Sequence, residues 1–142
     1  MDSEKPPSPA EALSNAAYRG DMPRVRQLVL EGVDVNIWGK NGYTPLTYAA
    51  MRGHLDIVLF LLANGAWADP HEDYDTYYTP LVKAIEGDHL EIVKMLIEAG
   101  ANPEWYVGLA QQTAECYARG YHKEIHAYLV RVIAERERRR KG

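Results

Sequence analysis

The stretch from Gly42 to Gly65 reads GYTPLTYAAMRGHLDIVLFLLANG and predicts two short antiparallel helices. Thr44 is a good helix cap, and Pro45 suits the first helical position because the N–H that it lacks has no partner there. Gly53 ends this helix, since a left-handed C-terminal residue is least strained as glycine. The second helix ends at Gly65 and carries its apolar side chains at Ile57, Val58, Phe60, Leu61 and Leu62. Two helices of this length cannot bury so much apolar surface alone, so they require similar units on both sides.

Similar units are present along the chain. The Thr-Pro-Leu of 79–81 repeats that of 44–46 at a shift of 35 residues, and 89–93 repeats 54–58 at the same shift. Upstream, the frame is matched at a shift of 33 residues by Gly20, Gly32 and Asp34-Val35-Asn36. A repeat of about 33 residues with a Thr-Pro-Leu helix start resembles the ankyrin repeat family. The resemblance covers the chain from Pro9 to Leu129. It implies an all-α fold, an ankyrin-type α-solenoid of stacked helix pairs with projecting β-hairpin-like fingers.

The first and last repeats depart from this pattern. The first lacks Thr-Pro-Leu and is more polar, and the fourth is degraded, as terminal caps with one face in water need to be. We expect the last helix to run from Lys123 to about Arg140 and to fray at its end. The expected layout is a disordered segment at 1–9, repeats at about 10–41, 42–76, 77–109 and 110–130, and a basic helical extension at 131–142.

Length and charge limit the class of protein. The chain of 142 residues suits one compact unit and has no apolar run of the roughly 20 residues that span a bilayer. Its single cysteine, Cys116, cannot form an internal disulfide, which favours a reducing compartment, the cytoplasm or the nucleus. Residues 1–130 carry 10 Lys/Arg against 18 Asp/Glu, and residues 131–142 carry 6 against 2, so an acidic body precedes a basic end. An acidic body argues against a nucleic-acid partner.

No grouping of residues predicts catalysis or a cofactor, so we expect a protein that is not an enzyme. His71, Glu72 and Asp73 are adjacent in the second finger and could be imagined as a metal or acid/base cluster, but neighbours in a loop rarely point at one spot. His54 and His89 are explained by packing and local hydrogen bonding. Cys116 is expected to be unreactive, since Arg119 is the one cation on its helical face.

The resemblance implies that fingers and exposed first-helix positions line one concave face that holds a protein partner. Aromatic side chains at loop positions support this, because each offers a large contact area with few rotatable bonds. Tyr48 is expected to pack between repeats, and Trp67 is assigned to packing more readily than to contact. Carried over residue by residue, the predicted partner-binding set is Tyr18, Arg19, Trp38, Lys40, Asn41, Tyr43, Met51, Arg52, Tyr74, Asp75, Tyr78, Glu86 and Trp105.

The predicted function is therefore that of a monomeric adaptor or stoichiometric inhibitor that binds another protein. The acids of the second finger favour a partner with a basic surface, reached by electrostatic steering. Three alternatives stay open. The finger at 69–78 could bind a metal or small ligand, or the chain could self-assemble through its fourth repeat. The run from Arg136 to Lys141 could contact an anionic surface, although Glu137 and the preceding Glu135 interrupt the basic charge.

Overall fold

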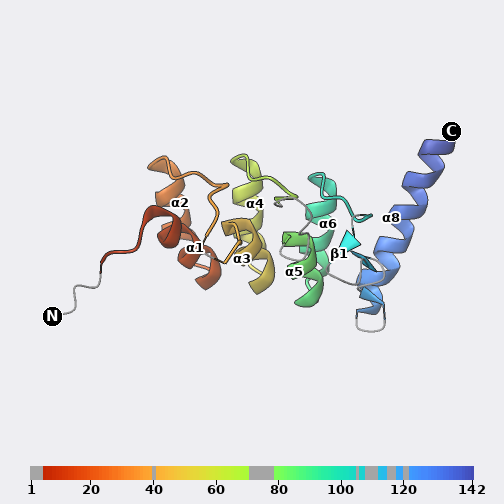
Figure 1. The fold of residues 1–142 in the computed structure, drawn as a ribbon, viewed down its shortest axis with the longest axis horizontal. Helices are drawn as coiled ribbons and strands as arrows, with labels where there is room; N and C mark the ends of the chain where they lie inside the picture. The colour runs from red at the N-terminus through yellow and green to blue at the C-terminus, as the bar shows by residue number, and fades with distance from the viewer. Residues whose placement is uncertain are drawn as a thin grey trace.

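The structure is a computed structural model, and it describes residues 5–39, 41–70, 79–104, 106–107, 112–114, 118–119 and 122–142. Three helix pairs stand side by side in a row, with a long helix at the C-terminal end (Figure 1). This arrangement confirms the predicted all-α solenoid. The pairs are α1 (Pro9–Arg19) with α2 (Met22–Leu30), α3 (Pro45–Arg52) with α4 (Leu55–Ala63), and α5 (Pro80–Glu86) with α6 (Leu90–Glu98). After them come β1 (Tyr106–Val107), antiparallel to β2 (Gln112–Thr113), and α8 (Lys123–Lys141).

Side-chain caps start the first helix of each pair. Ser8 Oγ accepts a hydrogen bond from the Glu11 backbone N–H at 3.2 Å, while the Glu11 carboxylate accepts from the Ser8 N–H at 2.9 Å. These two bonds form a capping box. The hydroxyls of Thr44 and Thr79 cap α3 and α5 by accepting from the backbone N–H groups of Thr47 and Val82, and each is followed by a proline. The helix starts predicted from Thr-Pro-Leu are confirmed.

The core is one apolar layer that runs through all the helix pairs. Equivalent positions of successive repeats contribute the same residue type to this layer. The repeats stack in register, with α1 packed on α3 and α3 packed on α5. Ile125 and Leu129 of α8 extend it at the C-terminal end, and both are fully buried. The repeated core positions are Leu13, Leu46 and Leu81 on the first helices and Val25, Val58 and Val93 on the second helices.

Histidines join each helix pair to the one before it. Nε2 of His54 donates a hydrogen bond to the Tyr18 carbonyl at 3.0 Å, and Nε2 of His89 donates to the Met51 carbonyl at 3.2 Å. The rings lie against left-handed glycines: a Cβ on Gly53, where φ is +77°, would come within 2.6 Å of the His89 ring. The sequence predicted packing and local bonds for these histidines. The structure instead shows bonds between neighbouring repeats.

The junction between the third pair and α8 is built differently. Asp88 occupies the position equivalent to Gly53, at the shift of 35 residues, and it adopts a left-handed φ of +59°. His122, which caps α8, places Nδ1 3.2 Å from an oxygen of the Asp88 carboxylate. At this junction the histidine therefore contacts the carboxylate of Asp88, whereas at the inner junctions the histidine ring packs against a glycine.

Candidate partner-binding surface

Three tyrosines from two repeats form a cluster on the first helices and the first finger. Tyr18 and Tyr48 meet edge to face with ring centroids 5.9 Å apart, and Tyr43 and Tyr48 do so at 5.1 Å. Such pairs contribute about 0.5–1.5 kcal/mol beyond the area that they bury. Tyr18 remains 42 % exposed, and the guanidinium of Arg52 lies over its ring, 4.8 Å from the centroid. The cluster is thus packed across two repeats and still presents an aromatic face and a cation to solvent.

Lys83 connects this cluster to the third repeat. Its Nζ lies 5.5 Å from the Tyr43 ring centroid and 3.1 Å from a carboxylate oxygen of Glu86, although only 7 % of the residue is exposed. Burial by itself would lower the pKa of Lys83, but the hydrogen bond and charge of Glu86, with a smaller contribution from Tyr43, outweigh it and raise the pKa. Lys83 therefore stays protonated and holds α5 against the first finger.

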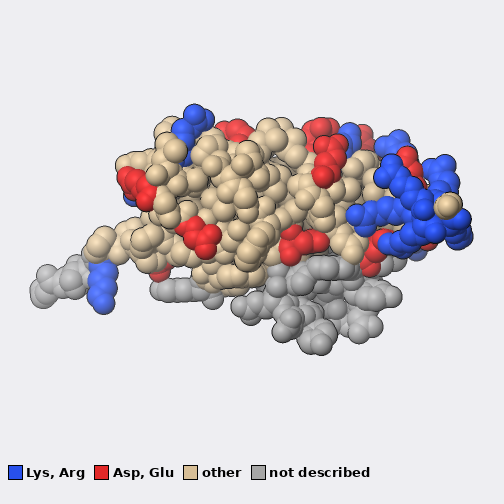
Figure 2. Space-filling model, turned by 90° about the horizontal axis from the view of Figure 1, so that it is seen from above, with Lys and Arg blue, Asp and Glu red and all other residues tan. Residues whose placement is uncertain are grey.

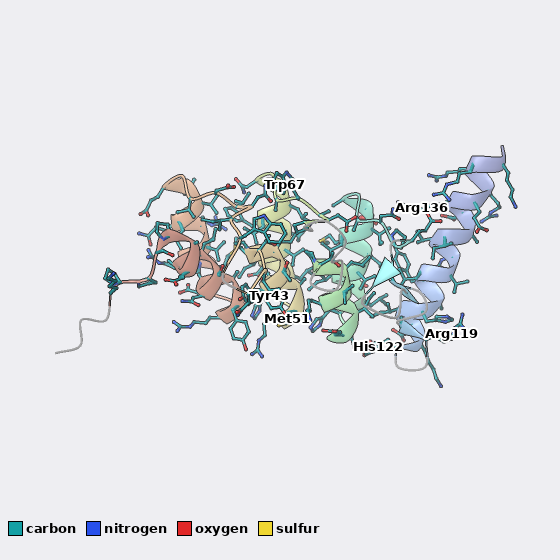
Figure 3. The ribbon with its side chains drawn as sticks, viewed as in Figure 1. Tyr43, Met51, Trp67, Arg119, His122 and Arg136 are labelled. Atoms are coloured by element: carbon teal, nitrogen blue, oxygen red, sulfur yellow. The ribbon has the colours of Figure 1, made fainter. Side chains whose placement is uncertain are left out.

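Other predicted partner-binding residues differ in exposure. Arg19 and Asn41 are exposed, as is Glu86 on α5, whereas Trp38 and Met51 are half-buried. In Figure 3 Tyr43 and Met51 lie together in the lower part of the second helix pair. The structure therefore brings Tyr18, Tyr43, Arg52 and, through Lys83, Glu86 into one group. The remaining predictions, Lys40, Tyr74, Asp75, Tyr78 and Trp105, fall outside the described residues, as do His71, Glu72 and Asp73.

Two members of the group were absent from the predicted partner-binding set. Tyr48 was expected to pack between repeats, and its contacts with Tyr18 and Tyr43 do link two repeats. Lys83 was not singled out. A signal for it exists, because the shift of 35 residues aligns Lys83 with Tyr48 and so places a charged residue at a packing position.

A second row of contacts runs along the bases of the fingers. Asn36 Oδ1 accepts a hydrogen bond from the Trp67 backbone N–H at 2.8 Å. One repeat further on, an Asp69 carboxylate oxygen accepts from the Asn102 N–H at 2.6 Å. Asn36 and Asp69 each lie four residues after a left-handed glycine, and Glu104 holds that position in the third repeat. We call the row Asn36, Trp67, Asp69, Asn102 and Glu104 the finger-base ridge.

At the end of this ridge, Glu104 accepts its hydrogen bonds from α8. Arg140 reaches both of its carboxylate oxygens, at 2.7 and 3.2 Å, and Arg136 reaches one at 3.4 Å. Arg136 also donates to Asn102 Oδ1 at 3.1 Å. Hydrogen bonds from Arg140, with the positive charges of both arginines, lower the pKa of Glu104. This arginine clamp, Arg136 and Arg140 on Glu104, holds the part of α8 that we expected to fray.

Three other cations lie in the last turn of α8. Arg138, Arg139 and Lys141 are exposed, and Figure 2 shows Lys and Arg gathered at this end of the molecule. Arg138 and Arg139 line an open depression of about 380 Å³ together with Glu135. Within the described residues, no three His, Cys, Asp or Glu side chains are grouped to hold a metal ion. Among the same residues, no helix is both long and apolar enough to cross a bilayer.

Comparison with known proteins identifies the repeats. The family model described as ankyrin repeats, in three copies, matches residues 13–105. A 2-5A-dependent ribonuclease of Mus musculus is 44 % identical over 61 residues, which cover 42 % of this chain and 8 % of that protein. Ankyrin repeat domain-containing protein 39 of Homo sapiens is 40 % identical over 39 % of this chain and 30 % of its own length.

A third relative, the Notch-regulated ankyrin repeat-containing protein of Homo sapiens, is 34 % identical over 62 residues, 44 % of this chain and 54 % of its own length. The matched segments thus span less than two thirds of each of these three relatives, and less than half of the present chain. The likeness is therefore one of repeat architecture, and it does not extend to any relative as a whole.

Proposed function

This chain belongs to the ankyrin repeat family, and we propose that it is an adaptor or stoichiometric inhibitor that binds one partner protein through its concave face. Ankyrin repeats are generally non-catalytic protein-interaction modules. Beyond this general role, we propose which face of this chain binds the partner and what that binding does. The mechanism is occupation of the partner's surface, which blocks or recruits that partner without chemistry by this chain.

The observation that carries the proposal is the tyrosine cluster with Arg52 on its exposed side. Tyr18, Tyr43 and Tyr48 are held by edge-to-face contacts, so an incoming side chain meets a surface that is already ordered. Preorganised aromatic and arginine side chains contribute most to binding because they lose little conformational entropy on association. The exposed fraction of Tyr18 and the cation above it supply the apolar and charged parts of such a contact.

Charge along this face supports an orientation for the partner. Arg19 and Arg52 lie on the first two repeats, whereas Glu86 and Asp88 lie at the end of α5 in the third. Opposite charges steer association and fix register more than they add affinity. The proposed partner therefore places basic groups at the third repeat and acidic groups at the first two. The acidic second finger adds to the preference for a basic surface at the C-terminal end.

Site-specific photo-crosslinking tests the proposal. A photoreactive amino acid replaces Asn41, which is exposed on the first finger, and the full chain is irradiated in a lysate of its source organism. The expected result is one covalent adduct that is identifiable by mass spectrometry. The purified adduct partner should bind the wild-type chain at one to one, and Tyr43→Ala should weaken this binding about tenfold or more.

The matched control places the same photoreactive group at Leu59, which is 47 % exposed on the outer helix α4. It should not give that adduct. If the adduct forms equally from Leu59, or if Tyr43→Ala and Arg52→Glu leave the affinity unchanged while the circular dichroism is intact, the concave face is not the binding surface.

A further inference from the structure

The finger-base ridge contains one position at which the second repeat departs from both of its neighbours. Asp34, Trp67 and Asn102 each lie two residues after a left-handed glycine. Asp34 Oδ1 accepts a hydrogen bond from the Asn36 N–H at 2.9 Å, and Asn102 Oδ1 accepts from the Glu104 N–H at 2.9 Å. Such side chains stabilise the turn locally. Trp67 has no acceptor, so the second repeat carries an indole in place of a turn-forming side chain.

The indole is exposed although its backbone is held. Trp67 is 59 % exposed, which corrects its assignment to packing. Asn36 fixes this segment twice, because its Oδ1 accepts from the Trp67 N–H and its Nδ2 donates to the Gly65 carbonyl at 3.0 Å. A tryptophan has only two side-chain torsions, so on a held backbone it loses little conformational entropy when a partner covers it, which is the property of an interface anchor.

The ridge leads from Trp67 directly to the cations of α8. Asp69 is bonded to Asn102, and Asn102 to Arg136, so the arginine clamp lies one repeat beyond Trp67. Figure 3 shows Trp67 and Arg136 along the upper side of the stack, above Tyr43 and Met51. The clamp holds Arg136 and Arg140 on Glu104, whereas Arg138 and Arg139 in the same turn of α8 are exposed.

We propose that Trp67 and the exposed arginines of α8, Arg138 and Arg139, form a second binding surface for a protein segment that carries an apolar side chain beside Asp or Glu residues. The apolar side chain packs on the indole, and the carboxylates meet Arg138 and Arg139 at the open depression. This surface is separate from the tyrosine cluster and does not depend on it.

Charge distribution favours an acidic protein segment over a nucleic acid or an anionic membrane. Residues 1–130 carry 18 Asp/Glu against 10 Lys/Arg, so an extended polyanion would be repelled by most of the molecule. Seen from above, most Lys and Arg groups gather at the α8 end, a few lie at the opposite end of the stack, and acidic groups are scattered along the rest of that face (Figure 2). A short segment with a few carboxylates at one end matches this pattern.

Peptide display on the immobilised full chain tests the proposal. Random peptides are first depleted on Trp67→Asp and then selected on the wild type. Trp67→Asp introduces the side chain that the equivalent position, Asp34, has in the first repeat, so it should keep the melting temperature. The expected peptides combine an aromatic or aliphatic residue with neighbouring Asp or Glu. In fluorescence anisotropy, a labelled peptide from this pool should lose about tenfold or more in affinity with Trp67→Asp.

Two further variants locate the charged part of the surface. Arg138→Gln with Arg139→Gln should weaken the peptide severalfold and flatten its salt dependence. Arg24→Gln, which changes an exposed arginine of α2, should leave its affinity unchanged. The proposal is overturned if depletion leaves no peptides, if the peptides lack acids, or if the arginine variants bind like the wild type. It is also overturned if a labelled oligonucleotide or a vesicle with anionic lipid binds Arg138 and Arg139 more tightly than the peptide.

Discussion

The junctions inside the stack and the junction at its C-terminal end use different interactions. Inside, His54 and His89 bond to backbone carbonyls of the preceding repeat, and Asn36 and Asp69 accept from backbone N–H groups of the next one. At the end, the equivalent position of the ridge is Glu104, whose partners are side chains of α8.

The difference follows from what each junction has available. An inner repeat finds the backbone of its neighbour at the same offset, because Asn36 and Asp69 each follow a left-handed glycine by four residues and bond to the next finger base. Beyond the third repeat, Glu104 finds the guanidinium groups of α8 instead. The consequence is that inner junctions depend on apolar burial and backbone bonds, whereas the end, which also buries Ile125 and Leu129, depends in addition on charge and so on salt and pH.

The largest loss of stability is expected from removing a side chain of the apolar core. Leu61 on α4 is fully buried, so Leu61→Ala should lower the free energy of unfolding by about 2–5 kcal/mol, the usual range for removing a buried leucine. Urea denaturation followed by circular dichroism measures it. A loss below about 1 kcal/mol would mean that this helix face does not carry the core.

A pair of glycine variants separates inter-repeat packing from backbone strain. Gly65→Ala places alanine at a φ of +91° with no atom near its Cβ, and should cost about 1–2 kcal/mol for the left-handed backbone. Gly53→Ala adds the contact with the His89 ring at 2.6 Å and should cost more, by about 1 kcal/mol or above. Equal losses in matched urea titrations would show that the histidine ring moves aside freely.

Removing the arginine clamp should have a smaller, pH-dependent effect. Glu104→Gln should cost about 1 kcal/mol near neutral pH, because the pairs with Arg136 and Arg140 are partly exposed. The folded pKa of Glu104 is lowered, so the stabilisation is complete above the unfolded pKa and is lost as pH falls through the folded one. Unfolding of both proteins across the acid range measures this. A difference that stays constant into acid would exclude the charge as its cause.

Substituting two arginines of α8 one at a time tests the clamp with a smaller expected loss of stability. Arg140→Gln removes the 2.7 Å contact with Glu104 and should cost about 0.5–1 kcal/mol, less in high salt. Arg138→Gln alters an exposed position and should stay within about 0.5 kcal/mol of the wild type. Melting curves at low and high salt compare them, and similar losses for the two would contradict the clamp.

The smallest change is expected at the first finger. Trp38 is half-buried in the loop before α3 and lies outside the buried core, so Trp38→Ala should shift stability by no more than about 0.5 kcal/mol. Thermal unfolding measures it. A large drop would move Trp38 from the partner-binding set to the core.

Much of the fold was predictable because the repeat imposes local signals. Thr44 followed by Pro45 predicts a capped helix start, and Gly53 predicts a left-handed helix end, because both features depend on short-range geometry alone. The tyrosine cluster was predictable in part, because Tyr18 and Tyr43 occupy exposed family positions. The burial of Lys83 was missed, because it depends on the exact approach of Glu86 and Tyr43 from two other segments.

The arginine clamp was also missed, although part of its signal lies in the sequence. Arg136 and Arg140 follow the buried Leu129 by 7 and 11 residues, which keeps them on the same helical face. We did not use this spacing as evidence of a contact, because a run of basic residues is usually exposed to solvent. The identity of the acceptor could not be predicted, because the distance from α8 to Glu104 is set by how the fourth repeat packs.

The occupied end of the finger-base ridge has a consequence for polymerisation. A repeat protein with an open terminal repeat presents a template on which another copy can stack head to tail, and such contacts do not close into rings but grow into fibres. Here the terminal acceptor, Glu104, already holds two guanidinium groups. An incoming copy would have to displace Arg136 and Arg140 before its first finger could bond to the ridge. We therefore expect the clamp to oppose head-to-tail stacking at this end as well as to hold α8.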